Sequence, residues 1–358
     1  MQTTRRIPRS FLSNRVLVRT LWLLAVVSVS VWGKTHFFAP LPRGAYPVLS
    51  TLSWAKPSPY SYPQYHWLPD GDLAYLERNP DGRLQVCYQK MNTGGPVGPV
   101  RRGQELPTAA WDCYFYPSPD EQRIAYFQLT RTRSFQTYVI SADTTTHDHA
   151  AAVGAVGEKF SVWLPDSRSF LAGSFTPRYH LKVYHLESHV VELVPPTTPL
   201  EVPIPAISVV NGADFLIGCG FDHLVPQSES SQNSHFITLR SFSGSHPTVA
   251  KRTWKVPVPT EPEGGSVIAS PDKRHLLWYT VTSKPSPQIQ WLRRLHLLRY
   301  SIDRNHAHYF LSDLYGNHRR PILEDGTDRN LITSPQWTPD SKHLSFVYKE
   351  QLYMLPVD

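Results

Sequence analysis

The stretch that decides the fold reads Pro117-Ser118-Pro119-Asp120-Glu121-Gln122-Arg123-Ile124-Ala125-Tyr126-Phe127. Proline presets φ near about −65° in a turn, and Asp accepts hydrogen bonds from backbone N–H groups just downstream. A short apolar run follows. The stretch therefore predicts a β-hairpin, in which one strand ends, the chain turns at Pro119-Asp120, and a second strand begins.

The Pro-Asp turn recurs along the chain. Its copies are Pro69-Asp70, Pro119-Asp120, Pro165-Asp166, Pro271-Asp272 and Pro339-Asp340. In most copies the residue two positions before the proline is aromatic, as at Trp67, Trp163 and Trp337. A degenerate sixth copy has Asn211 in place of Asp, and Asn-Gly is itself a strong hairpin turn. Recurrence of one unit predicts a repeat architecture.

The strands that follow the turns are apolar on both faces, as in Ile124–Phe127. Such a strand needs a neighbouring sheet on each side. Four-stranded antiparallel sheets that pack face to face around an axis meet this requirement. The sequence therefore predicts an all-β fold, a single β-propeller over residues 61–358. Six blades are expected, and a hidden seventh unit in Trp291–Leu323 is the alternative.

Residues 34–60 are rich in proline and contain the β-prone run Tyr46–Trp54, which has no hairpin partner of its own. The last repeat has room for only three strands before Asp358. We expect Tyr46–Trp54 to supply the outer strand of the last blade, because this pairing closes the ring and removes an open sheet edge. The rest of 34–60 is expected to be a stalk.

The N-terminal segment carries most of the net charge. Residues 1–15 are basic, residues 16–33 are mainly apolar, and together they hold five arginines and no acidic residue, against a formal charge of +7 for the chain. This layout is typical of an export signal, and its charge bias places the N-terminus in the cytoplasm. We expect an N-terminal hydrophobic helix that acts as a signal-anchor, with the propeller outside the cytoplasmic membrane. Cleavage of a signal peptide, followed by secretion, is the alternative.

Charge also bears on nucleic-acid binding, which requires a dense cationic face. Outside residues 1–33 the numbers of basic and acidic residues are nearly equal, and these residues are dispersed along the chain. We therefore expect no nucleic-acid partner.

Cysteine and histidine are the residues that could bind a metal or form a disulfide. Cys87 and Cys113 could pair in an oxidising compartment, or they and Cys219 could be buried thiols. Two His-x-His pairs would share a face if they lay on strands, and could then chelate a metal. The pairs are His147 with His149, in a polar loop, and His306 with His308, next to a strand. Neither pair is assigned as a metal site, and no cofactor is expected.

The aromatic-x-Pro-Asp hairpin resembles the WD-repeat-like unit of TolB-type propellers. It is also similar to the propeller domains of prolyl-oligopeptidase-like proteins. The resemblance covers about residues 46–358 and implies a β-propeller fold. The α/β N-terminal domain of TolB has no counterpart here, and the Gly-x-Ser-x-Gly elbow of the hydrolase domain is absent from the sequence.

These features predict a membrane-tethered, non-enzymatic binding or scaffold module. Its loops and channel mouth would be presented to a protein, peptide or glycan. The repeated aspartates are assigned to the turns, because a catalytic pair does not need a copy in every blade. No catalytic, cofactor-binding or metal-binding residue is assigned. The alternative is a lactonase- or phosphodiesterase-like propeller hydrolase with a metal in the central channel.

Overall fold

The computed structural model describes residues 41–56, 64–92, 95–107, 113–129, 134–143, 151–174, 180–194, 205–210, 214–219, 221–222, 236–243, 246–257, 264–282, 306–327 and 332–357. Regular secondary structure in these ranges consists of β-strands, and they contain no helix long and apolar enough to cross a membrane. The predicted basic segment 1–15 and hydrophobic helix 16–33 lie outside the described residues.

The described strands form six antiparallel sheets, numbered here in chain order. Sheet 1 contains β2 (Tyr65–Trp67), β3 (Leu73–Arg78), β4 (Leu84–Asn92) and β5 (Gly95–Leu106). Sheet 2 contains β6 (Cys113–Pro117), β7 (Arg123–Leu129), β8 (Phe135–Ser141) and β9 (Ala151–Val153). Sheet 3 contains β10 (Glu158–Trp163), β11 (Ser169–Ser174), β12 (His180–His185) and β13 (Val191–Leu193).

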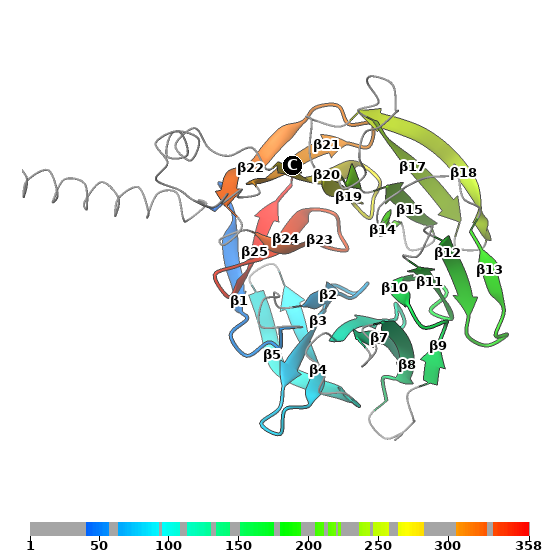
Figure 1. Ribbon diagram of the computed structural model, residues 1–358. Coiled ribbons are helices and arrows are strands. Elements are labelled where there is room, and N and C mark those ends of the chain that lie inside the picture. Colours follow the sequence, from blue (N-terminus) through cyan, green and yellow to red (C-terminus); the bar gives the residue numbers. More distant parts are fainter. Residues whose placement is uncertain are drawn as a thin grey trace, which may run out of the picture.

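The second half of the chain forms the other three sheets. Sheet 4 contains β14 (Pro205–Val210), β15 (Asp214–Cys219), β17 (Phe236–Ser243) and β18 (His246–Pro257). Sheet 5 contains β16 (Phe221–Asp222), β19 (Gly264–Ala269), β20 (His275–Thr282), β21 (His306–Asp313) and β22 (Arg320–Thr327). Sheet 6 contains β1 (Tyr46–Ser50), β25 (Gln351–Pro356), β24 (His343–Tyr348) and β23 (Thr333–Trp337). The sheets lie around a common centre in chain order, which is the arrangement of a β-propeller (Figure 1).

Five of these sheets have the predicted four-stranded form, and sheet 5 departs from it. Its additional strand, β16, comes from the connection between β15 and β17 of sheet 4. It pairs with the inner strand β19 through Phe221↔Gly265 and Asp222↔Gly264. The alternative of a seventh unit in Trp291–Leu323 finds no support in the described part of that segment. There β21 pairs with β20, so these strands belong to sheet 5.

Six apolar clusters fill the gaps between consecutive sheets. The second strand of each sheet explains this pattern, because successive side chains on a strand point to opposite faces. In β7, Ile124 and Tyr126 pack toward sheet 1, whereas Ala125 and Phe127 pack toward sheet 3. All four are at most 1% exposed. This confirms the prediction that the second strands lie between two neighbouring sheets.

The ring is closed by the pairing of β1 with β25, as the sequence predicts for this segment. The register joins Tyr46 with Met354 and Ser50 with Gln351, with a bulge between Pro47 and Leu49. Beyond β1, the backbone N–H of Thr51 donates to the Glu350 carbonyl at 2.8 Å. The last sheet is therefore completed by the first described strand.

The cysteines behave as small buried apolar residues. Cys87 and Cys113 are free thiols, and they pack in different clusters. Cys87 faces the gap with sheet 6, and Cys113 lies in the gap between sheets 1 and 2. Burial raises the pKa of each thiol to about 12. Of the two alternatives, the structure therefore supports buried thiols over a disulfide for Cys87 and Cys113. Cys219 is the last residue of β15.

The cluster between sheets 6 and 1 provides a test of ring closure. Trp54 is 4% exposed and stacks on Tyr75 with ring centroids 4.5 Å apart, whereas nearby Leu52 is 73% exposed. We expect Trp54→Ala to lower the free energy of unfolding by about 3–5 kcal/mol, as is typical of a buried Trp. The control Leu52→Ala should change it by less than about 0.5 kcal/mol. Equal urea unfolding midpoints for the two variants would contradict closure through this cluster.

Candidate functional site

The repeated aspartates hold the five described Pro-Asp turns. In each, Asp Oδ1 accepts a hydrogen bond from the backbone N–H two residues later. The pairs are Asp70 with Asp72 at 2.9 Å, and Asp120 with Gln122, Asp166 with Arg168, Asp272 with Arg274 and Asp340 with Lys342, each at 3.0 Å. This is the bond that the sequence assigns to these carboxylates. Asn211 lies outside the described residues, between the paired strands β14 and β15.

The residue after each Asp adopts a positive φ, which the sequence did not indicate. The angles are 92° at Gly71, 58° at Glu121, 56° at Ser167, 61° at Lys273 and 61° at Ser341. This left-handed conformation is easiest for glycine, which occupies only the first copy. The turns are thus three-residue Pro-Asp-x bends, with a strained third residue in four copies.

A hydroxyl group supports three of the turns. Ser118, Ser270 and Thr338 stand before the turn proline, and each donates to the Asp carboxylate of its own turn at 2.6 Å. Burial opposes ionisation of Asp120, but bonds from Ser118 and a backbone N–H outweigh it and lower the pKa. The same balance, with the Thr338 hydroxyl, lowers the pKa of Asp340. These carboxylates therefore stay ionised at neutral pH.

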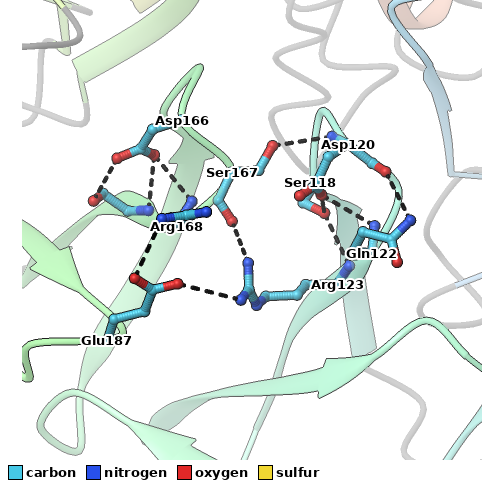
Figure 2. Close-up of polar contacts among 9 residues, drawn as sticks. Ser118, Asp120, Gln122, Arg123, Asp166, Ser167, Arg168 and Glu187 are labelled. Atoms are coloured by element: carbon cyan, nitrogen blue, oxygen red, sulfur yellow. Dashed lines mark hydrogen bonds and ion pairs between the residues drawn. The ribbon is translucent and has the colours of Figure 1, made fainter.

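Neighbouring turns are also bonded to each other (Figure 2). Ser167 Oγ in sheet 3 accepts a hydrogen bond from the backbone N–H of Asp120 in sheet 2 at 3.0 Å. Arg123 donates to the Ser167 carbonyl at 3.0 Å and lies 3.9 Å from Glu187. Sheets 5 and 6 repeat the first link, from the Asp272 N–H to Ser341 Oγ at 2.9 Å. Two pairs of neighbouring turns on the rim are thus linked directly.

The aromatic residues before the turns join adjacent sheets. Trp67 Nε1 donates to Ser345 Oγ at 2.7 Å. Trp163 Nε1 donates to the Tyr116 carbonyl at 2.8 Å, and Trp337 Nε1 donates to the Ile268 carbonyl at 3.1 Å. Each bond reaches a strand of the preceding sheet around the ring. The indole N–H groups are therefore engaged, and only ring faces and edges are available to a ligand.

A central cavity of about 540 Å³ lies at the turn end of the propeller. Its wall comes from positions that recur in the repeat: the third residue before the turn proline, the aromatic position and the prolines. The lining residues are His66, Trp67, Leu68, Pro69, Tyr116, Pro117, Ser118, Pro119, Val162, Trp163, Pro271, Asp272, Gln336, Trp337, Pro339, Asp340 and Ser341. The size is that of a small-ligand or peptide pocket, and the wall is mainly apolar.

A second hollow, here called the seam hollow, adjoins the central cavity between sheets 6 and 1. It measures about 390 Å³. It shares Trp67, Pro69, Pro339 and Asp340 with the central cavity. The remaining lining residues are Asp70, Gly71, Met91, Asn92, Thr338, His343 and Met354. The two hollows thus run from the channel mouth to the seam where β1 closes the ring.

Residues of several Pro-Asp turns line these two hollows. Pro69, Pro119, Pro271 and Pro339 line the central cavity together with Asp272 and Asp340, and Asp70 lines the seam hollow. Pro165, Asp120 and Asp166 line neither. His66, Tyr116, Val162 and Gln336 also line the central cavity, and none of them was expected there from the sequence. A signal for them existed, because each stands three residues before a turn proline.

Among the described residues that line the central cavity, His66 is the histidine. It lies 5.1 Å from the Phe115 ring and 4.9 Å from the Tyr116 ring, between centroids. Burial lowers its pKa to about 4, although a backbone hydrogen bond at Phe115 opposes the shift. The ring is therefore neutral at physiological pH and adds no positive charge to the cavity.

Of the four histidines considered as metal ligands, two belong to the part of the chain that the structure describes. His147 and His149 lie outside the described residues, and His306 and His308 both belong to β21. Within the ranges that the structure describes, no group of three or more His, Cys, Asp or Glu side chains is placed to hold a metal.

The low pKa of His66 predicts a pH-dependent stability. The unfolded chain binds a proton on this ring below about pH 6.5, but the native chain does so only near pH 4. The native state is therefore destabilised as the pH falls from about 6.5 to 4, by up to about 3 kcal/mol. We expect His66→Gln to flatten this part of the curve in urea unfolding, and the exposed-site control His318→Gln to leave it unchanged. Identical pH slopes for wild type and His66→Gln would contradict the prediction.

Comparisons with known proteins concern the fold. No protein-family model matches the chain, and no curated protein matches its sequence. A solved structure described as TolB from Agrobacterium tumefaciens is 15% identical, with 82% of this chain and 90% of that chain covered and a TM-score of 0.49. TolB from Acinetobacter baumannii is 14% identical, with 80% and 64% covered and a TM-score of 0.44. The β-propeller domain of the Trilobed protease from Pyrococcus furiosus is 14% identical, with 83% and 82% covered and a TM-score of 0.41. The chain is thus similar to TolB-type and prolyl-oligopeptidase-like propellers at low sequence identity. The β-propeller fold itself is shown by the arrangement of its own sheets.

Proposed function

We propose that this propeller is a non-enzymatic recognition module whose partner, a protein, peptide or glycan, docks at the turn end. The central cavity is the observation that carries the proposal. It is concave, it is lined mainly by aromatic, aliphatic and proline side chains, and the turns that frame it are held by repeated hydrogen bonds. A rigid, mostly apolar hollow with a few polar groups is the usual form of a binding site.

The hydrogen bonds of the polar groups also favour a binding function over a catalytic one. The indole N–H groups of Trp67, Trp163 and Trp337 bond to neighbouring sheets, and the carboxylates of Asp272 and Asp340 bond within their turns. These groups are already used to build the rim. Contact with a partner would come largely from ring surfaces and prolines, as in sites that bind extended or proline-containing segments.

The proposal is tested by blocking the cavity. Val162→Glu would place a charge in the apolar wall, and Val97→Glu would make the same change on the exposed outer strand β5, where Val97 is 45% exposed. We expect full-length wild type and Val97→Glu to capture the same partners from an envelope extract, and Val162→Glu to lose them. Thermal unfolding would verify that both variants are folded. Capture of the same partners by folded Val162→Glu would rule out the cavity as the binding site.

We further propose that residues 16–33 form a hydrophobic helix that tethers the propeller to the outer side of a cytoplasmic membrane. Support comes from the apolar run, the five arginines within residues 1–33 and the absence of acidic residues there. Positive charge on the N-terminal side of such a segment keeps that side cytoplasmic. The propeller would then meet its partner outside the cytoplasm.

Membrane fractionation with an alkaline wash tests the tether. We expect the full-length chain to remain in the membrane pellet after the wash, and added protease to digest it only from the outer side. Release of a shortened chain into the medium would instead indicate a cleaved signal peptide. Full-length chain in the cytosolic fraction would refute both the tether and export.

A further inference from the structure

We propose that the partner segment is basic: an extended peptide whose lysine or arginine side chains lie across the central cavity and the seam hollow. This inference rests on the proposed function and specifies its ligand. The observation behind it is a charge pattern. Outside residues 1–33 the chain has 31 basic and 29 acidic residues, yet the described residues that line the two hollows include three aspartates and no lysine or arginine.

The three carboxylates lie along the path of the two hollows. Asp272 lines the central cavity, Asp70 lines the seam hollow, and Asp340 lines both. The side chains of Asp272 and Asp340 are 35% and 51% exposed. Their Oδ1 atoms serve the turns, and each carboxylate keeps a second oxygen that no turn bond uses. A cation could therefore approach these oxygens without breaking the turns.

Basic side chains lie near this track, and among them Lys342 acts on Asp340 through its charge. Arg274 Nε lies 3.7 Å from Asp272 Oδ2, and the Arg274 side chain is 80% exposed. Because exposed ion pairs contribute little free energy, a ligand cation could replace Arg274 at this carboxylate. His343 Nδ1 lies 3.8 Å from Asp340 Oδ2 and carries charge only when protonated. His66, in the wall, is neutral at physiological pH because burial lowers its pKa. The described lining residues thus offer three carboxylates to a cation and contain no lysine or arginine.

Aromatic side chains line the same hollows as these carboxylates. Trp67 lines both hollows with Asp340, and Tyr116 and Trp337 line the central cavity. The face of an indole or phenol ring attracts Lys and Arg cations, and the effect grows when the pair is shielded from water. The long alkyl stems of these side chains also suit an apolar wall. Met91 and Met354 in the seam hollow add flexible apolar surface.

An extended peptide fits this geometry better than an isolated cation does. The two hollows share four lining residues, so one continuous segment can occupy both. Side chains of an extended strand alternate in direction, so basic residues can face the aspartates while intervening residues contact prolines and rings. An anionic partner, including nucleic acid, would be repelled by the same lining.

The test uses the full-length chain in detergent and three fluorescent peptides of equal length with identical proline and leucine positions. The variable positions carry lysine, glutamine or glutamate. We expect fluorescence anisotropy to show the lysine peptide binding at least about tenfold more tightly than the glutamine peptide, a difference of about 1.4 kcal/mol. Added salt should lower the affinity for the lysine peptide only, because salt screens the attraction between charges.

Two matched variants locate the charge. Asp340→Asn removes a lining charge and keeps a carbonyl oxygen for the turn. Asp166→Asn makes the same change in a turn that lines neither hollow. We expect Asp340→Asn to lower the affinity for the lysine peptide several-fold without changing the affinity for the glutamine peptide. Asp166→Asn should leave both affinities unchanged. If Asp340→Asn is poorly folded, Asp272→Asn tests the same loss of affinity for the lysine peptide.

The outcomes separate this inference from the proposed function. Equal affinity for the three peptides, or equal effects of Asp340→Asn and Asp166→Asn, would overturn the basic ligand. If Val162→Glu still abolished binding in that case, the cavity would remain a binding site. Absence of binding by every peptide would also overturn the basic ligand. The proposed function would fall only if Val162→Glu retained the captured partners.

Discussion

Burial of each second strand between two neighbouring sheets is the constraint on which the rest of the structure depends. Ile124 and Tyr126 fill one gap while Ala125 and Phe127 fill the next, so loss of either neighbouring sheet would expose one of these apolar faces to water. Repeated around the axis, this requirement leaves one place where the ring must be closed. The pairing of β1 with β25 closes it there, and it brings Trp54 into the gap between sheets 6 and 1.

Ring closure also shapes the candidate site. The seam hollow lies between sheets 6 and 1, and the indole of Trp67 is held at this seam by Ser345. Gln336 in turn donates to the Tyr65 carbonyl of sheet 1 at 2.5 Å. These bonds join residues from opposite ends of the chain. The turn end of the propeller is therefore a surface on which a binding site and the closing contacts coincide.

Much of the fold could be predicted because the Pro-Asp turn acts locally. Proline and Asp shape the backbone from within the turn, so five copies were visible without any tertiary information. The positive φ of Glu121, Ser167, Lys273 and Ser341 was not visible, because none of these residue types favours it. The extra strand β16 was missed for a related reason. Its pairing with β19 depends on where the chain passes the next sheet and not on its two residues alone.

By itself, the sequence determined the hairpin unit, its repetition in a ring, the closing strand and the turn role of the aspartates, because each depends on local geometry or on periodicity. Only the tertiary structure decided that four of the Pro-Asp turns line one cavity, with His66, Tyr116, Val162 and Gln336 in its wall. It also decided that Cys87 and Cys113 face different gaps. The physical reason is that the cavity wall is assembled from residues of several sheets. Which residues meet there depends on how the sheets pack, and no single repeat contains that information.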